Sequence, residues 1–130
     1  MYFNKEVVVI VLDYNRPDLT NKCLESIWMY NRVNIVLVNN GLANHQEYDK
    51  NIPYLYIVNS RGRSFSIGMN TGMKAASAFN PKYIIFLNND SILTEGSLRL
   101  LVVALESNPK LGMVSSGYKY SFGYLNKEMY

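Results

Sequence analysis

The chain has 130 residues, enough for one small domain with a single core of two or three layers. Its 48% hydrophobic and 18% charged residues are typical of a globular protein and exclude extended disorder. The formal net charge is only +3, and no Lys or Arg adjoins another, so we expect no nucleic acid partner.

The N-terminal apolar run and the single cysteine bear on where the protein works. The run ends at Leu12 and is too short for a signal peptide or a membrane span. Cys23 lies in a helical pattern, which favours a buried thiol in a reducing compartment. We therefore expect a cytoplasmic protein, with peripheral contact to an anionic membrane surface as the alternative.

Short apolar strands alternate with amphipathic helices along the chain. Pro17 suits the first turn of a helix that ends near Asn31, and Thr94 can cap a later helix. A middle helix has an apolar stripe of Ile67, Met73, Ala76 and Phe79. The expected strands are at residues 7–12, 35–38, 54–58, 83–87 and 111–115.

This alternation predicts an α/β fold with an open, mostly parallel sheet and helices on both faces. Ligands of such sheets bind beyond the carboxyl ends of the strands. Polar clusters follow four of the predicted strands and should meet at this edge. These clusters are residues 13–15, 39–41, 61–64 and 88–90.

The cluster Asn88-Asn89-Asp90 follows five apolar residues, so we expect its carboxylate at the end of a buried strand and not in the core. Oxygen ligands of this kind suit magnesium or manganese, and a bound diphosphate would complete the coordination. Asn and Asp also form turns and cap helices, so a turn without a ligand is the alternative.

Two further features are suited to contact a nucleotide. Arg61 and Arg63, in a loop before a helix, have the forked donors that bind phosphate, although solvated arginines are common in such loops. Tyr14 can stack on a base or pack on its neighbours. The sequence contains no zinc cluster, P-loop or serine nucleophile motif.

Five segments in order resemble the family 2 glycosyltransferases, which have the Rossmann-like GT-A fold. They are residues 7–17, 24–27, 36–41, 68–72 and 86–90, and the similarity extends from Val7 to about Gly117. The resemblance implies transfer of a sugar from a nucleoside diphosphate donor, of the uridine or thymidine type, with inversion at the anomeric carbon. It also implies Mn²⁺ or Mg²⁺ as cofactor, and an acceptor sugar, lipid or protein that the sequence does not identify.

The same resemblance implies roles for particular residues. Asp90 is the expected metal ligand, and Asn88 the expected ribose contact. Tyr14 falls in the nucleotide-contacting motif at a strand end, and Asn39 falls where an aspartate usually reads a pyrimidine base. Arg63 lies in the donor-binding segment, where it would contact the diphosphate and, with the metal, stabilise the leaving group.

Three departures from the family pattern matter. Asn39 replaces the usual aspartate, which leaves the base preference open. Asn88 leaves one carboxylate in the metal motif, which should weaken metal affinity. The catalytic base is not identified, because Glu128 is the only acidic residue after Glu106. We therefore expect a truncated piece, a remnant, or a donor domain completed by a partner.

A nucleotide-diphospho-sugar-binding domain is expected at residues 1–117, followed at residues 118–130 by an aromatic tail or the start of a truncated acceptor-binding part. Aromatic side chains alternate in the tail and would share one face of a strand; they are Tyr118, Tyr120, Phe122 and Tyr124. That face would contact an acceptor sugar, a second copy of the chain, a partner chain or a membrane, or pack on the protein's own core.

Two functions of different classes are open. One is a metal-dependent glycosyltransferase, and the other is a non-catalytic nucleotide-sugar-binding or assembly module. A sugar nucleotidyltransferase is disfavoured, because its Gly-rich loop should follow the first strand and residues 13–17 contain no glycine.

Overall fold

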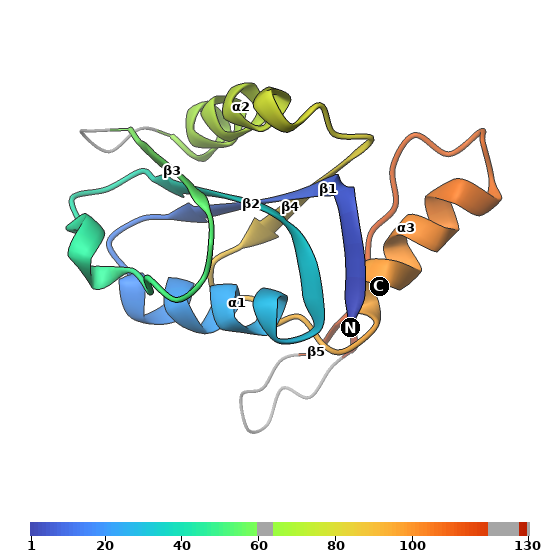
Figure 1. Cartoon of the computed structure of the whole chain (residues 1–130), viewed down its shortest axis with the longest axis horizontal. Helices are drawn as coiled ribbons and strands as arrows, with labels where there is room; N and C mark the ends of the chain where they lie inside the picture. Colours follow the sequence, from blue (N-terminus) through green and yellow to red (C-terminus); the bar gives the residue numbers. More distant parts are fainter. Residues whose placement is uncertain (60–63, 120–127, 130) are drawn as a thin grey trace. The chain divides into compact units, whose positions relative to one another are not determined.

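The computed structural model describes residues 1–59, 64–119 and 128–129, and the chain divides into two compact units (Figure 1). In its described residues the first unit, Met1–Thr94, holds a four-stranded sheet and two α-helices. The second unit, Glu95–Tyr130, holds a further helix and two short strands. All the predicted site residues fall within the first unit.

The sheet of the first unit is open and parallel, in the order β3-β2-β1-β4. Its strands are β1 (Tyr2–Asp13), β2 (Asn31–Asn39), β3 (Leu55–Val58) and β4 (Tyr83–Asn88). The continuous apolar run at residues 7–11 of β1 is wholly inaccessible to solvent, as expected of a strand covered on both faces. The predicted parallel, open α/β sheet is confirmed.

The strand before the predicted metal motif, β4, is less buried than its apolar sequence suggested. It lies at an edge of the sheet, where β1 is its partner. Its side chains alternate between partly buried and exposed, and Ile84 and Phe86 are 38% and 48% exposed. The expectation of a buried strand here was therefore wrong for one of its two faces, since an edge strand is covered less completely than a central one.

Two helices cover opposite faces of the sheet (Figure 1). The first, α1 (Pro17–Tyr30), begins and ends where the sequence predicted and buries Cys23, Leu24 and Ile27. The second, α2 (Phe65–Ala76), continues into the short 3-10 helix η2 (Ser77–Phe79). Among the residues that the structure describes, no helix is long and apolar enough to cross a membrane.

The face that α2 turns to the sheet agrees only in part with the predicted stripe. Ile67 and Met73 are 46% and 43% exposed. The buried residues are the predicted Ala76 together with Gly68, Met69 and Gly72, and they pack on the core side chains of β1 and β2. A Cβ atom at Gly72 would lie 2.5 Å from Cγ2 of Ile10, so the glycine lets the helix backbone approach the sheet. Hydrophobic periodicity does not detect such a contact, so the predicted stripe was right for Ala76 and Phe79 and wrong for Ile67 and Met73.

Gly72→Ala is expected to destabilise the first unit. Alanine gains about 1 kcal/mol of helix propensity over glycine, but overpacking against a β-branched side chain costs about 1 to 3 kcal/mol, so we expect a net loss. Gly68→Ala should cost less, because its nearest neighbour is the terminal Cδ1 of Leu12, which can rotate away. Urea unfolding measures both variants, and a Gly72→Ala variant more stable than the wild type would contradict the close-approach explanation.

The second unit contains α3 (Ser97–Ser107) and an antiparallel pair, β5 (Tyr118–Lys119) and β6 (Glu128–Met129). Gly96, with φ of 79°, occupies the position before α3, so the prediction that Thr94 caps this helix was wrong. The expected strand at residues 111–115 is also absent from the described chain, where this segment is largely exposed and has no strand partner. The predicted domain boundary after residue 117 stays a prediction.

Candidate functional site

The strands of the first unit end side by side at one edge of the sheet. Asp13 lies in register with Asn39 of β2, and on the other side of β1 Leu12 lies in register with Asn88 of β4. Because the strands are parallel, the polar residues that follow them meet at this edge, which is where ligands of open α/β sheets bind.

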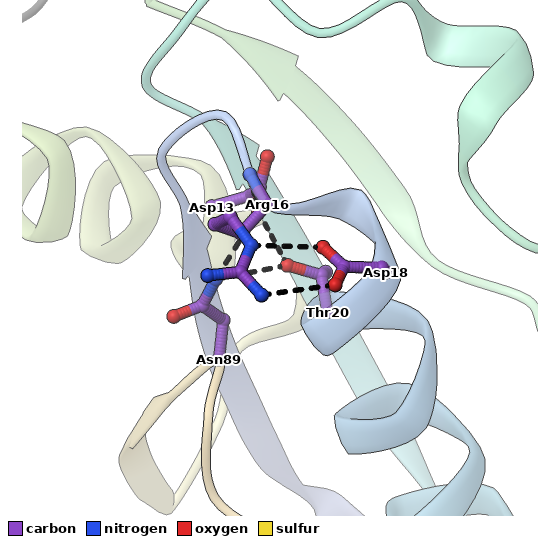
Figure 2. Close-up of polar contacts among 5 residues, drawn as sticks. All are labelled: Asp13, Arg16, Asp18, Thr20 and Asn89. Atoms are coloured by element: carbon purple, nitrogen blue, oxygen red, sulfur yellow. Dashed lines mark hydrogen bonds and ion pairs between the residues drawn. The ribbon is translucent and has the colours of Figure 1, made fainter.

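Asp13, at the end of β1, is fully buried and accepts four hydrogen bonds, and the donors Arg16, Thr20 and Asn89 are among the residues drawn in Figure 2. Its Oδ1 accepts from Thr20 Oγ1 at 2.5 Å, from Asn89 Nδ2 at 3.1 Å and from the Arg16 backbone N at 3.2 Å. Its Oδ2 accepts from the Tyr48 hydroxyl at 2.5 Å. These donors take the place of water around the carboxylate. Burial, followed by the bond to Asp13, raises the pKa of Tyr48.

The role of Asp13 as a buried centre of hydrogen bonds was not predicted. One signal was available, because Asp13 continues a wholly apolar run, where a carboxylate needs partners to be tolerated. Two of its partners, however, are distant in sequence: Tyr48 follows it by 35 residues and Asn89 by 76. No local pattern connects them.

The Asn88-Asn89-Asp90 cluster forms a turn, closed by a hydrogen bond of 3.0 Å from the Ser91 backbone N to the Asn88 carbonyl O. Its middle residue, Asn89, is bonded to the buried Asp13, whereas Asn88 and Asp90 are exposed. The Asp90 carboxylate makes no hydrogen bond or ion pair with any residue that the structure describes. The cluster is thus a turn that also presents one unpaired carboxylate to solvent.

Asn39 shapes the loop after β2. Its side chain is 2% exposed, and its Nδ2 donates to the Ala43 carbonyl O at 2.7 Å and to the Tyr56 hydroxyl at 3.0 Å. Its Oδ1 accepts from the Gly41 backbone N at 3.1 Å. The predicted base-contacting amide is therefore engaged with the protein, and it fixes the course of residues 39–43.

Tyr14 is the exposed aromatic residue at the end of β1, with 58% of its surface accessible. The next residue, Asn15, has a left-handed backbone with φ of 56°, and its Oδ1 accepts from the Leu42 backbone N at 2.7 Å. Any side chain at Gly41 would collide with Asn15. The loops after β1 and β2 are thus held against each other, with Tyr14 facing solvent next to them.

An aromatic cluster adjoins the loop after β2. His45, in the 3-10 helix η1 (His45–Glu47), stacks on Tyr56 with ring centroids 3.8 Å apart and planes at 5°. Tyr48 and Tyr54 lie 5.8 and 6.4 Å from the Tyr56 ring. This stacking gives His45 a structural role.

Arg16 adjoins the site through its backbone bond to Asp13 (Figure 2). Its guanidinium forms two hydrogen bonds of 3.0 Å with the Asp18 carboxylate, and these bonds lower the pKa of Asp18 to about 2. Both side chains are more than half exposed. Exposed ion pairs of this kind contribute little to stability.

Two predicted features lie outside the described residues. One is the arginine loop, with Arg61 and Arg63, and the other is the aromatic tail at residues 120–124. The helix after the loop begins at Phe65, with Ser64 as its N-cap: the Ser64 Oγ accepts from the Ile67 backbone N at 3.2 Å. The diphosphate contact assigned to Arg63 stays a prediction.

The oxygen donors at the turn suit a hard divalent ion. Among the residues that the structure describes, no three His, Cys, Asp or Glu side chains gather into a metal site. The exposed Asp90 carboxylate and Asn88 amide do fit Mg²⁺ or Mn²⁺ that keeps several waters and shares its coordination with substrate phosphates. A closed, all-protein metal cage does not fit them.

Cys23 lies next to the same turn. Its Sγ donates to the Asn88 carbonyl O at 3.6 Å, and the side chain is fully buried, as predicted. Burial first, and then the negative charge of Asp90, raise the pKa of the thiol to about 12. The thiol therefore stays protonated at neutral pH and is a poor nucleophile.

This raised pKa predicts a loss of stability at alkaline pH. The contribution of the thiol to the free energy of unfolding is fully present below its unfolded pKa of about 8.5 and falls as the pH rises towards 12. We expect the wild type to lose about 2 kcal/mol more than Cys23→Ala between about pH 8 and pH 10. Urea unfolding of both proteins across this range measures the difference. Parallel pH profiles would contradict the assigned shift.

Together the fold and the site define a class of protein: an open parallel α/β domain with polar side chains gathered at the carboxyl ends of its strands. A family model described as Glycosyl transferase family 2 matches residues 8–129, and the chain belongs to this family. At the family level it is a glycosyltransferase domain of the GT-A, Rossmann-like type, which implies a nucleotide-sugar donor and an acceptor. No curated protein matches the chain.

Proposed function

We propose that the chain binds a nucleoside diphosphate sugar together with Mn²⁺ or Mg²⁺ at the carboxyl edge of its sheet and transfers the sugar to an acceptor with inversion. The observation that carries this proposal is the unpaired, exposed carboxylate of Asp90 on a turn tied to the buried Asp13. The hydrogen bond from Asn89 to Asp13 limits the movement of the turn, so the Asp90 carboxylate is positioned to bind a cation.

The proposed roles divide along the edge of the sheet. Asp90 is the metal ligand, Asn88 contacts the ribose and Arg63 contacts the diphosphate. A bound divalent ion would supply Lewis-acid stabilisation of the charge on the leaving diphosphate. The guanidinium of Arg63 would add forked hydrogen bonds to the same diphosphate oxygens.

The nucleobase, of the uridine or thymidine type, is proposed to lie on the loops after β1 and β2. Tyr14 has the exposed ring surface that stacking needs. Because the Asn39 side chain is 2% exposed and bonded within its loop, we assign it an indirect part in base binding. It holds the backbone of residues 40–43, which then contacts the edge of the base.

A non-catalytic nucleotide-sugar-binding or assembly module is the second candidate. The single carboxylate of the turn favours it, because Asn88 and Asn89 add no negative charge for a metal ion. Both candidates require metal-dependent donor binding, and only the enzyme requires transfer. Turnover therefore separates them.

Calorimetric titration with uridine, thymidine and guanosine diphosphates, each with and without Mn²⁺, tests the proposal. We expect Mn²⁺ to strengthen binding of the uridine or thymidine compound. If Mn²⁺ strengthens none of the three, both candidate functions are rejected. Binding of the donor sugar nucleotide without hydrolysis or transfer across an acceptor panel would support the module over the enzyme.

A further inference from the structure

We propose that Asp13 and Asn89 form a matched carboxylate–amide pair that positions the turn carrying Asp90. The inference rests on the proposed function in one respect, namely that Asp90 is the metal ligand. Asp13 itself is a positioning residue, because both of its oxygens are already engaged by protein donors.

The pair is part of a closed triangle of hydrogen bonds (Figure 2). Asn89 Nδ2 lies 3.1 Å from both Asp13 Oδ1 and Thr20 Oγ1. The Thr20 hydroxyl in turn donates to Asp13 Oδ1 at 2.5 Å. The three side chains come from β1, from α1 and from the turn after β4, so the triangle fixes the turn to the two elements that end or begin beside it.

The buried carboxylate determines which residue suits position 89. An ionised carboxylate only accepts hydrogen bonds, so its neighbour must donate them, and the Asn89 amide does. An aspartate at position 89 would place a second carboxylate about 3 Å from Asp13, where like charges repel strongly because burial limits screening. The amide in the middle of the Asn88-Asn89-Asp90 motif is thus the complement of Asp13.

The pairing predicts that Asn89→Asp weakens Mn²⁺ binding, whereas the added negative charge alone would strengthen it. An extra carboxylate next to Asp90 would ordinarily strengthen binding of Mn²⁺. If Asp13 and Asn89 are a matched pair, Asn89→Asp instead pushes the turn away from β1 and displaces Asp90. The sign of the change in metal-dependent affinity therefore distinguishes the two expectations.

The central experiment is a carboxylate–amide exchange, with uridine diphosphate binding measured by calorimetry with and without Mn²⁺. Asn89→Asp should weaken the Mn²⁺-dependent affinity by about tenfold or more, the usual range for residues that orient a metal ligand. The double variant Asp13→Asn/Asn89→Asp restores a donor–acceptor pair in reverse, although it loses the bond from the Arg16 backbone N, and it should recover part of the affinity lost in Asn89→Asp. Stronger Mn²⁺ binding by Asn89→Asp, or no recovery in the double variant, would overturn the pairing.

Asn88→Asp is the matched control for added charge. It introduces the same carboxylate one position earlier, on an exposed side chain that does not contact Asp13. Asn88→Asp should change the Mn²⁺-dependent affinity by the same factor in the wild-type and in the Asp13→Asn background. A rescue of Asn88→Asp by Asp13→Asn would mean that the exchange acts through total charge and not through the pair.

A readout without ligand separates this inference from the proposed function. The Ser91 backbone N–H closes the turn on Asn88, so its hydrogen exchange reports how well the turn is held. Exchange should quicken in Asn89→Asp and slow again in the double variant. If the wild type fails to bind any diphosphate but this pattern holds, the proposed function falls and the pair stands. If diphosphate binds and the exchange pattern is absent, the proposed function stands and the Asp13–Asn89 pair is rejected.

Asn89→Ala covers the case in which Asn89→Asp does not fold. It removes the amide without adding charge, and Asp13 keeps its bonds to Thr20, Tyr48 and the Arg16 backbone. We expect a folded protein with faster exchange at Ser91 and weaker Mn²⁺-dependent affinity. Unchanged values of both in Asn89→Ala would refute the positioning role.

Discussion

Replacing Asp90 by alanine is expected to lower the Mn²⁺-dependent affinity for a nucleoside diphosphate by about 100-fold, because loss of an orienting partner alone costs about 10- to 100-fold and Asp90 is the proposed ligand itself. The free energy of unfolding should change by less than about 0.5 kcal/mol, since the side chain is exposed and bonds to no described residue. Calorimetry and urea unfolding of the same preparation measure both quantities.

Glu6→Ala is the matched control for this variant. Glu6 lies before the buried run of β1, at the opposite end of the strand from Asp13, and it is likewise exposed. It removes the same charge, so it reveals any effect of net charge on the binding of Mn²⁺ or diphosphate. Equal losses in the two variants, or an Asp90→Ala protein with unchanged Mn²⁺-dependent affinity, would reject Asp90 as the ligand.

The parallel sheet could be predicted because its central strands are almost uniform in sequence. Residues 7–11 and 35–38 are continuous aliphatic runs, and such short runs are typical of strands that are covered on both faces. Pro17 correctly marked the start of α1, since proline fits the first helical turn. The position of β4 at an edge was not readable, because strand order depends on contacts between segments far apart in the chain.

The orientation of α2, which packs on the sheet through its glycines, was a second feature that apolar periodicity did not predict. Apolar periodicity ranks Ile67 and Met73 above Gly68 and Gly72, yet the glycines face the sheet. What decides the orientation is the distance between the backbones, which a large side chain would increase. A pair of glycines four residues apart in a helix therefore deserves weight as a packing signal.

The site was predictable to the extent that topology determines it. Asn39, Asn88 and the residues after β1 meet at one edge because parallel strands end together. How each side chain is used was not predictable. Asn39 is occupied by its own loop, and the engagement of Asp13 with Asn89 depends on a contact across 76 residues.

Asp13→Ala is expected to reduce the free energy of unfolding by about 3 kcal/mol, the usual effect of leaving several buried polar groups without a partner. The Tyr48 hydroxyl and the Thr20 hydroxyl both donate to the lost carboxylate, and the two residues are 2% and 0% exposed. Water cannot readily reach these donors, so each adds its own desolvation penalty. Urea unfolding of the variant measures the loss.

A double-mutant cycle with Tyr48→Phe assigns part of this loss to one donor. Tyr48→Phe alone should cost about 1 kcal/mol, because it removes one hydrogen bond and leaves Asp13 with three donors. In the Asp13→Ala background the same change should cost nothing or stabilise, since the phenol there is already unpaired. The two losses should therefore not add, with a coupling of about 1 kcal/mol or more. Simple additivity would show that the hydroxyl finds another partner when Asp13 is absent, and that the carboxylate is not the centre that joins β1 and α1 to the segments of Tyr48 and Asn89.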